Sequence, residues 1–370
     1  MNPTLIAGAR PNFMKIAPII HAIKKAQIEG KNIHYRLVHT GQHYDQKMSY
    51  TFFKELNIPE PDENLGCGGG TQAEQTAAIM VAFEKELLAN PTDLVMVVGD
   101  VTSTMACSIV AKKLNTKVAH VEAGIRSLDL TMPEEINRMV TDALADYFFT
   151  PTELANQNLR NTGAKPGQIF FVGNVMIDTL LTNRHRFQKP AVWDELKLEK
   201  GNYLVMTLHR PANVDEEAKF KALLDEIINA SHGLPIIFPV HPRTAKIINN
   251  IYSTSLRGGT TKQPLPKSLH LVEPLGYLEF NYLVQNAKAV ITDSGGITEE
   301  TTVMGIPCLT LRDNTERPET VEIGTNELIG TNPAAIKPSL DKLFAGEWKT
   351  GSIPELWDGK AAERIISNLI

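Results

Sequence analysis

A charged loop that begins near residue 120 carries two glutamates at positions suited to proton transfer. Glu122 directly follows the apolar run 118–121, so it stands where a short buried strand would end. Glu134 follows Pro133, and a proline followed by acidic residues is typical of the first turn of a helix. Both carboxylates would then face a crevice at the edge of a sheet. Two carboxylates in one crevice suit a reaction that removes and returns protons.

A purely structural explanation remains open when this loop is taken alone. Glu134 and Glu135 would complement the positive end of a helix dipole. Arg126 and Arg138 would pair with them on the surface, where ion pairs contribute little to stability. The polar residues at other strand ends favour the catalytic interpretation.

Polar side chains follow the expected strands throughout the chain, at the ends where parallel sheets bind ligands. In the first half they are Arg10 with Lys15, Gln42 with His43, Asp100, and Glu122. In the second half they are His209 with Arg210, His241, Glu273, and Asp293. Each has a simpler explanation by itself, since a residue such as Asp100 often caps the next helix. Their recurrence in eight loops indicates a polar binding cleft.

A glycine turn in the second half has the features of an anion site. It joins an expected strand to an expected helix and consists of Ser294, Gly295 and Gly296. Free backbone N–H groups and the helix dipole would attract a phosphate there. Glu300 lies about one turn into the helix and could accept hydrogen bonds from a ribose diol. Arg312 and Arg317 follow the next strand and could clamp phosphate oxygens. A solvated helix face and a surface ion-pair network are the simpler explanations.

Motifs of several common enzyme classes are absent from the chain. The patterns GxGxxG, GxxxxGK[ST] and GxSxG do not occur, which disfavours dinucleotide binding, P-loop chemistry and a serine hydrolase. Cys67, Cys107 and Cys308 are widely spaced and lack a CxxC or a nearby histidine pattern. They support neither a disulfide framework nor a zinc site, and we expect no metal.

Short β-branched runs alternate with helical segments along the first half of the chain. We predict strands at 5–7, 35–39, 94–98, 118–121, 147–149 and 169–172. We predict helices at 14–27, 46–56, 102–114 and 134–145. This alternation is typical of a parallel sheet that is covered on both faces.

The alternation restarts after a charged segment, 188–202, which has the character of a linker. Strands are predicted at 203–207, 235–240, 269–272, 289–292 and 308–310, and helices at 216–230 and 276–286. The chain is thus predicted to be α/β, with two Rossmann-like, doubly wound domains facing a central cleft. The first domain spans 1–187 and the second 188–370, whose last helix could pack back on the first.

Size and charge narrow the class of protein further. The 370 residues, with 42% hydrophobic content, suffice for two cores. The 37 basic and 42 acidic residues give a net charge of -5 without long runs of one sign, so neither nucleic acid nor an anionic membrane is an expected partner. No signal peptide or long apolar span is present, and we expect a cytoplasmic protein. The segment 253–267 is expected to be a mobile surface loop.

Eight motifs in this order resemble the non-hydrolysing UDP-N-acetylglucosamine 2-epimerase family. They are GARPNFMK at Gly8, GDVTST at Gly99, HVEAGIRS at His120, PEEINR at Pro133, FVGNVMID at Phe171, LHRPAN at Leu208, TDSGGITEE at Thr292 and RDNTERPE at Arg312. The resemblance covers nearly the whole chain. It implies a glycosyltransferase-B type fold, with the ligand between two domains and the nucleotide held mainly by the second.

The resemblance also implies roles for single residues. Asp100, Glu122 and Glu134 would be the acid and base carboxylates, and His209 would assist near the leaving diphosphate. From the first domain Arg10 and Lys15 would face the diphosphate or the sugar. The residues implied in nucleotide binding are Ser294, Gly295 and Gly296 for phosphates, Glu300 for the ribose, Arg317 for a phosphate, and Arg210 and His241 beside them.

The resemblance leaves the regulation and the exact sugar open. Gln42, His43 and Arg210 lie where some members bind a second, activating substrate molecule, and the segments around them depart from the commonest pattern. Relatives act on UDP-2-acetamido sugars that differ at C3 and C6. The implied substrate is UDP-GlcNAc, converted to UDP-ManNAc for cell-surface polysaccharide synthesis, and the implied assembly is a homodimer.

The implied chemistry explains the need for several carboxylates. The C2 proton of the sugar is barely acidic because no carbonyl adjoins it. Departure of the diphosphate from C1 builds positive charge on the ring and makes that proton more acidic. Anti elimination to a glycal and UDP, followed by re-addition, inverts C2 without a redox cofactor. Domain closure would protect the glycal from water.

Two other classes of protein remain as alternatives. A glycosyltransferase of the same fold would share the nucleotide half but would need an acceptor groove. A sugar-nucleotide sensor would close on its ligand without chemistry. Loss of one of the three carboxylates would favour the sensor, and Asp100, Glu122 and Glu134 are all present.

Overall fold

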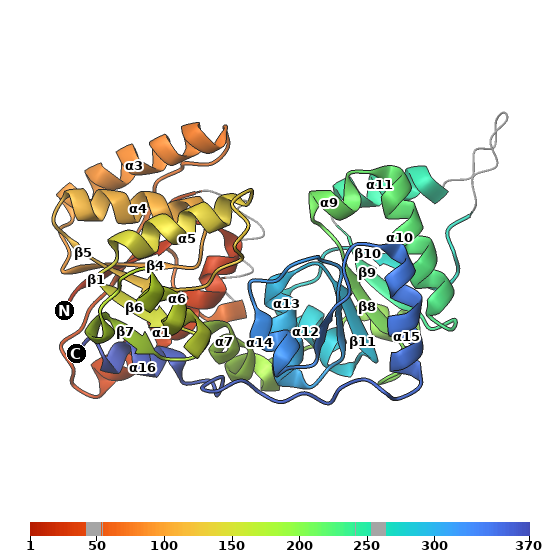
Figure 1. Cartoon of the computed structure of the whole chain (residues 1–370). Helices are drawn as coiled ribbons and strands as arrows, with labels where there is room; N and C mark the ends of the chain where they lie inside the picture. Colours follow the sequence, from red (N-terminus) through yellow and green to blue (C-terminus); the bar gives the residue numbers. More distant parts are fainter. Residues whose placement is uncertain (42–52, 54, 241, 253–263) are drawn as a thin grey trace. The chain divides into compact units, whose positions relative to one another are not determined.

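The computed structural model describes the chain except residues 42–52, 54, 241 and 253–263 (Figure 1). The chain divides into two compact units. Unit 1 consists of Met1–His185 and Glu355–Ile370, and unit 2 of Arg186–Pro354. Most of the predicted helix 46–56 and of the predicted loop 253–267 lies outside the described residues.

Unit 1 is built on a seven-stranded parallel sheet with the order β3-β2-β1-β4-β5-β6-β7. Its strands are β1 (Pro3–Ala7), β2 (Arg36–His39), β3 (Glu63–Asn64), β4 (Leu94–Val98), β5 (Lys117–Val121), β6 (Tyr147–Thr150) and β7 (Ile169–Phe171). Every residue of the central strand β4, LVMVV, is buried. Such a continuous apolar run indicates a strand that is covered on both faces.

Two groups of helices cover the sheet of unit 1 (Figure 1). One group contains α3 (Gln72–Ala89), α4 (Thr102–Lys113) and α5 (Pro133–Leu144). The other contains α1 (Arg10–Ile28), α7 (Val175–Asn183) and the C-terminal α16 (Ala361–Ser367), while α6 (Glu153–Asn161) precedes β7. The helix α3 was not predicted, although the capping box that Thr71 forms with Glu74 is a readable signal for its start.

Unit 2 repeats this plan with a six-stranded parallel sheet of order β10-β9-β8-β11-β12-β13. Its strands are β8 (Leu204–Thr207), β9 (Ile236–Pro239), β10 (Leu269–Val272), β11 (Ala289–Thr292), β12 (Cys308–Thr310) and β13 (Asn326–Leu328). Its helices are α8 (Ala191–Glu195), α9 (Pro211–Val214), α10 (Glu217–Ala230), α11 (Pro242–Tyr252), α12 (Tyr277–Asn286), α13 (Gly295–Met304), α14 (Pro318–Glu322) and α15 (Ile336–Phe344). The predicted α/β class with two parallel, doubly wound sheets is confirmed.

The charged segment 188–202 is part of unit 2 and contains the short helix α8. Val192 and Leu198 are buried in one of the two core clusters of this unit. Trp193 packs edge-on against Tyr203 and Tyr282. These apolar contacts make the segment part of a packed domain. Among the described residues, no helix is both long and apolar enough to cross a membrane.

The C-terminal helix α16 packs on α1 and α7 of unit 1. Its own N-cap residue, Lys360, makes no side-chain capping bond. Asp178 on α7 accepts hydrogen bonds instead from the backbone N–H groups of Ala361 (3.0 Å) and Ala362 (2.7 Å). Burial raises the pKa of Asp178 to about 6, although these two bonds act in the opposite direction. A side chain distant in sequence therefore caps the last helix.

We expect the variant Asp178→Ala to destabilise unit 1 by about 1 kcal/mol, because loss of a helix cap costs roughly that much. Calorimetry should show a transition lowered by ~2–4 °C. The control is Glu363→Ala on the same helix, whose exposed ion pair with Lys25 should contribute little to stability.

The cost of Asp178→Ala should also depend on pH. The pKa of Asp178 is higher in the folded state than in the unfolded chain, so the folded protein binds the extra proton between about pH 4 and 6. Wild-type stability should therefore fall relative to the variant as pH rises through this window. An equal difference at pH 4.5 and pH 7.5 would contradict the assignment.

Candidate active site

Glu122 stands at the end of β5 in a backbone conformation that few non-glycine residues adopt. Its φ angle is +68°, and its side chain is buried. The backbone N–H groups of Glu122 and Ala123 both donate to the carbonyl of Phe149 at the end of β6. Lys15 of α1 places its Nζ 2.6 Å from Oε2 of Glu122. The carboxylate is thus held, with a cation beside it, at the carboxyl edge of the sheet.

Asp100 follows β4 at the same edge. The preceding Gly99 has φ +65°, and a Cβ atom there would lie 2.7 Å from Nζ of Lys15 and 3.8 Å from Oε2 of Glu122. The left-handed φ favours glycine here, and its lack of a side chain leaves room for Nζ of Lys15. Arg138 of α5 donates from Nε (3.0 Å) and Nη2 (2.6 Å) to Oδ2 of Asp100. The two predicted carboxylates are therefore brought to neighbouring strand ends, each beside a cation.

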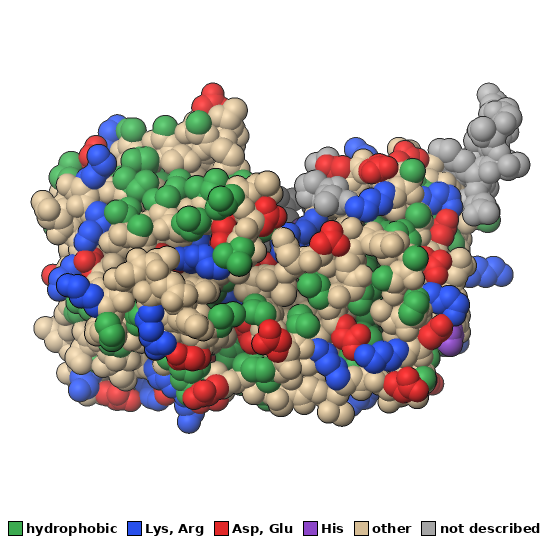
Figure 2. All heavy atoms as spheres, viewed as in Figure 1, with side chains coloured by type: hydrophobic (Ala, Val, Ile, Leu, Met, Phe, Trp, Pro, Cys, Tyr) green, Lys and Arg blue, Asp and Glu red, His purple; other side chains and the backbone are tan. Residues whose placement is uncertain are grey.

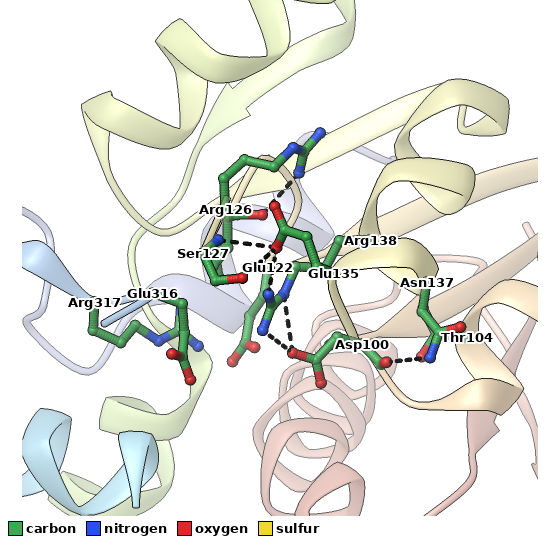
Figure 3. Close-up of polar contacts among 12 residues, drawn as sticks. Asp100, Thr104, Glu122, Arg126, Ser127, Glu135, Asn137, Arg138, Glu316 and Arg317 are labelled. Carbon is green, nitrogen blue, oxygen red and sulfur yellow. Dashed lines mark hydrogen bonds and ion pairs between the residues drawn. The ribbon is translucent and has the colours of Figure 1, made fainter. Parts of the chain in front are cut away.

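The first turn of α5 carries two adjacent glutamates with different surroundings. Figure 3 shows Glu135 between Ser127 and Arg138. Glu135 is buried and accepts bonds from the N–H groups of Ser127 and Leu128 and from Nη1 of Arg138. Burial would raise the pKa of Glu135, but these donors outweigh it and lower the pKa. Glu134 is exposed. The loop 122–128 is thus anchored by Glu135, while Glu134 is left accessible.

Arg138 pairs with Glu135, as the structural explanation expected, but the pair is buried rather than on the surface, and Arg126 has a different partner. Arg138 is only 3% exposed and bridges Asp100 and Glu135, so it lies in the interior of unit 1. Arg126 pairs with Asp142 of α5, with 2.6 Å between Nη1 and Oδ2. Charges that must be buried need partners of opposite sign, and here each arginine has a buried or half-buried carboxylate.

A second group of buried charges was missed in the sequence. Asp142 accepts from the N–H of Gly124 (3.1 Å) and lies 2.7 Å from Nδ1 of His120, in addition to its pair with Arg126. His120 contacts the carbonyl oxygen of Gly99 (2.8 Å) with its other ring nitrogen. Glu135 and Asp142 are about two helical turns apart and so lie on one face of α5. This spacing could have indicated a second buried acidic group on that face.

In unit 2, Asp293 organises the ends of β8 and β11. It is fully buried and accepts from the backbone N–H groups of His209 and Arg210 and from Nδ2 of Asn213. Nδ1 of His209 lies 2.8 Å from Asp293, while the His209 side chain is 63% exposed. Burial would raise the pKa of Asp293, but His209, Arg210 and Asn213 lower it. His209 is thus oriented by a carboxylate, with Nε2 as its outward-facing nitrogen.

The predicted anion turn, Ser294 to Gly296, lies between β11 and α13. No side chain caps the start of α13, so its first N–H groups suit a phosphate. Glu300 is buried in this helix and accepts from the hydroxyl of Tyr277 at 2.8 Å. Burial raises the pKa of Glu300 to about 7, although the bond from Tyr277 lowers it.

The two arginines after β12 are both paired and buried. Arg317 contacts Glu299 of α13 (Nε to Oε1, 2.8 Å), and Arg312 contacts Glu316 (Nη2 to Oε2, 2.6 Å). Burial would raise the pKa of Glu316, but Arg312 lowers it to about 2. The arginines are thus held by acidic partners inside unit 2, rather than in a surface network.

The other predicted site residues fall into two groups. Glu273 follows β10 and is exposed. Gln42, His43 and His241 lie outside the described residues, and the structure describes only the backbone of Arg10, at the start of α1. Within the described ranges of the chain, no group of His, Cys, Asp and Glu has the arrangement of a metal site.

We expect Arg138→Met to destabilise the protein by about 3–5 kcal/mol, because it leaves Asp100 and the buried Glu135 without their shared cation. Urea denaturation measures this loss. The control Arg160→Met removes an exposed pair with Glu153 and should cost less than ~1 kcal/mol. Equal losses of unfolding free energy in the two variants would show that the buried Arg138 bridge stabilises the protein no more than an exposed ion pair.

Comparison with known proteins gives consistent matches over most of the chain. The family model described as UDP-N-acetylglucosamine 2-epimerase matches residues 25–370. The UDP-N-acetylglucosamine 2-epimerase of Methanocaldococcus jannaschii is 40% identical and aligns with 99% of this chain and 98% of its own. The UDP-2,3-diacetamido-2,3-dideoxy-D-glucuronate 2-epimerase of Pseudomonas aeruginosa is 38% identical, with 88% and 87% covered.

Solved structures of similar proteins share the fold. The Methanocaldococcus jannaschii UDP-GlcNAc 2-epimerase in complex with UDP-GlcNAc and UDP is 39% identical, with a TM-score of 0.87, and covers 100% of this chain and 99% of its own. The UDP-GlcNAc 2-epimerase of Neisseria meningitidis bound to UDP-GlcNAc is 28% identical, with a TM-score of 0.86 and 100% and 99% covered. These matches confirm the predicted glycosyltransferase-B type fold. The chain belongs to the UDP-N-acetylglucosamine 2-epimerase family.

Proposed function

We propose that the protein inverts C2 of UDP-N-acetylglucosamine to give UDP-N-acetylmannosamine. The observation that carries this proposal is the pair of carboxylates, Asp100 and Glu122, at adjacent strand ends of unit 1, each beside a cation. Family membership supplies the reaction class, and two solved relatives bind UDP-GlcNAc. We further propose that the product serves cell-surface polysaccharide synthesis in the cytoplasm.

The proposed reaction proceeds by elimination and re-addition. One carboxylate removes the C2 proton as the C1–O bond to the diphosphate breaks, which gives a glycal and UDP. A carboxylate on the other face then returns a proton to C2 as UDP adds back to C1. Asp100, Glu122 and Glu134 are the candidates for these transfers. His209, oriented by Asp293, would stabilise the leaving diphosphate.

Unit 2 has the groups that a bound UDP would need. The open start of α13 suits the diphosphate, and the carboxylate of Glu300 suits the ribose diol. Arg317 would turn from Glu299 to a phosphate oxygen. The remaining proposed contacts are Arg10, Lys15, Gln42, His43, Arg210, His241 and Glu273.

A second substrate is supported by one relative. The Pseudomonas aeruginosa protein named for a diacetamido glucuronate is nearly as similar to this chain as the Methanocaldococcus jannaschii epimerase. The same elimination at C1 and C2 would serve that sugar, since its C3 and C6 substituents do not take part. The proposed reaction is therefore the same for either sugar, and UDP-GlcNAc is our first candidate substrate.

We also propose that the protein forms a homodimer through α3 and α5. Figure 2 shows hydrophobic side chains gathered over this region of unit 1. Val81 and Leu88 of α3 are 57% and 63% exposed, and Ile136 and Met139 of α5 are about half exposed. Large apolar side chains that cluster on a surface are typical of protein interfaces.

Turnover in deuterium oxide tests the proposed reaction. Product formed from UDP-GlcNAc should carry deuterium at C2, because the acid that returns the proton exchanges with solvent. Proton NMR should show loss of the C2 signal in the new sugar. In Glu122→Gln, turnover should fall roughly a hundredfold to ten-thousandfold, the usual range for loss of a general acid or base. Product that retains the original hydrogen would argue for a direct or hydride route.

The nucleotide site is tested by calorimetry with UDP. Arg317→Ala should weaken UDP binding roughly 10- to 100-fold, as expected for loss of a charged hydrogen bond. Lys337→Ala, which removes an exposed pair with Asp341, is the control and should leave the affinity unchanged. If Arg317→Ala binds UDP like wild type, the nucleotide lies elsewhere.

The affinity for UDP should also depend on the charge of Glu300. Its pKa of about 7 means that the carboxylate becomes protonated as pH falls below 7 and then accepts hydrogen bonds poorly. UDP affinity should therefore decrease from pH 8 to pH 6 by more in wild type than in Glu300→Gln. The same decrease in both proteins would assign the pH effect to the nucleotide itself.

The dimer is tested by analytical ultracentrifugation. A lysine at Val81 or Leu88 should shift the protein from dimer to monomer, because a charge would be buried in the interface. The control Ile28→Lys changes an 88% exposed residue at the end of α1 and should leave the dimer intact. A monomeric wild-type protein would refute the proposal.

A further inference from the structure

One buried carboxylate of unit 1 bonds to the end of β5, which carries Glu122, and reaches the end of β4, which precedes Asp100, through the ring of His120. Asp142 of α5 has a nearly inaccessible side chain, 2% exposed. Its oxygens face three donors, the ring of His120, the N–H of Gly124 and the guanidinium of Arg126. None of these atoms belongs to a residue proposed to touch the sugar. The cluster formed by Asp142, His120, Gly124 and Arg126 therefore has no assigned role in the proposed reaction.

The contacts of Asp142 bracket Glu122 in the chain. His120 comes two residues before Glu122, Gly124 comes two residues after it, and both are bound by Asp142. Glu122 has a φ angle of +68°, a conformation that a non-glycine residue keeps only when its surroundings impose it. Gly124 also has a positive φ, and a Cβ there would lie 2.3 Å from the carbonyl oxygen of Ala155. Asp142 thus holds both sides of a strained residue.

The same cluster reaches the backbone beside Asp100. The second ring nitrogen of His120 lies 2.8 Å from the carbonyl oxygen of Gly99, and the N–H of Gly99 donates to Val121. Gly99 directly precedes Asp100, and its φ of +65° is a conformation that favours glycine. The end of β4 is therefore tied to the end of β5 through the ring that Asp142 holds.

We propose that Asp142 is a positioning residue, which places Glu122 and Asp100 relative to each other through Gly124 and His120. This inference rests on the proposed epimerase reaction, in which both carboxylates must reach one carbon atom. A displacement of about 1 Å in a reacting group can cost roughly a hundredfold in rate. Asp142 acts without contact to the substrate, so its loss should change turnover more than binding.

The variant Asp142→Asn tests this role with little change of shape. The amide keeps the shape of Asp142 but loses the negative charge that pairs with the guanidinium of Arg126, and one amide oxygen replaces two carboxylate oxygens as acceptor. We expect turnover to fall roughly 10- to 100-fold with the substrate KM and the UDP affinity within about threefold of wild type. Hydrogen exchange at the amides of residues 122–124 should be faster.

A matched control is available at the other end of β5. Asp146 lies four residues beyond Asp142 and accepts from the N–H of Val118, near the start of the strand, while it pairs with Lys112. Asp146→Asn should lower the unfolding temperature but leave turnover and the exchange of residues 122–124 close to wild type. If turnover falls in proportion to the unfolding temperature in both Asp142→Asn and Asp146→Asn, the loss reflects stability alone and the positioning role is overturned.

The outcomes separate this inference from the proposed function. If wild-type protein epimerises no UDP-2-acetamido sugar, the proposed function fails. The rate of amide exchange at residues 122–124 in Asp142→Asn then tests by itself whether Asp142 positions Glu122. Unchanged exchange and turnover in folded Asp142→Asn overturn the inference. Should that variant not fold, His120→Gln replaces it, since one amide cannot bind both Asp142 and Gly99 as the ring does. Faster exchange at Gly99 and reduced turnover are expected there, and wild-type values overturn the inference.

Discussion

Each sheet of this protein is parallel throughout, and this constraint decides where its chemistry can lie. In a parallel sheet all carboxyl ends open on one edge, and loops held there on a rigid support are where open α/β sheets bind ligands. Asp100, Glu122 and Lys15 meet at that edge in unit 1, and His209, Asp293 and the start of α13 lie at the corresponding edge of unit 2. The polar residues of the site are thus a consequence of the topology.

Charges gathered at such an edge must be balanced if they are to be buried. In unit 1, α1 supplies Lys15 to Glu122, while α5 supplies Arg138 to Asp100, Glu135 to the loop after Glu122, and Asp142 to His120. Unit 2 uses Asp293 in the same way for the backbone of His209 and Arg210. Glu134 and His209, by contrast, are exposed.

The sequence could predict the strands and their polar ends, because short apolar runs followed by glycine and charge are local signals. It could not predict which glutamate of the pair at the start of α5 would be buried. Neighbouring residues on a helix point about 100° apart, so the choice between Glu134 and Glu135 depends on how α5 is rotated against the sheet. The sequence also could not predict that Arg126 would pair with Asp142, or that Arg138 would reach Asp100 as well as Glu135, since these groups become neighbours only when α5 packs. The role of Asp293 was hidden because its partners, His209 and Asn213, are some 80 residues away in the chain.

The proposed epimerisation requires that the bond between C1 of the sugar and the diphosphate breaks in each turnover. Positional isotope exchange measures this directly, with UDP-GlcNAc that carries oxygen-18 in the bridge between C1 and the β-phosphorus. If the bond breaks, the freed phosphate rotates, and the label should spread from the bridge to the non-bridging oxygens of recovered substrate and product. A label that stays in the bridge after many turnovers would contradict elimination and re-addition.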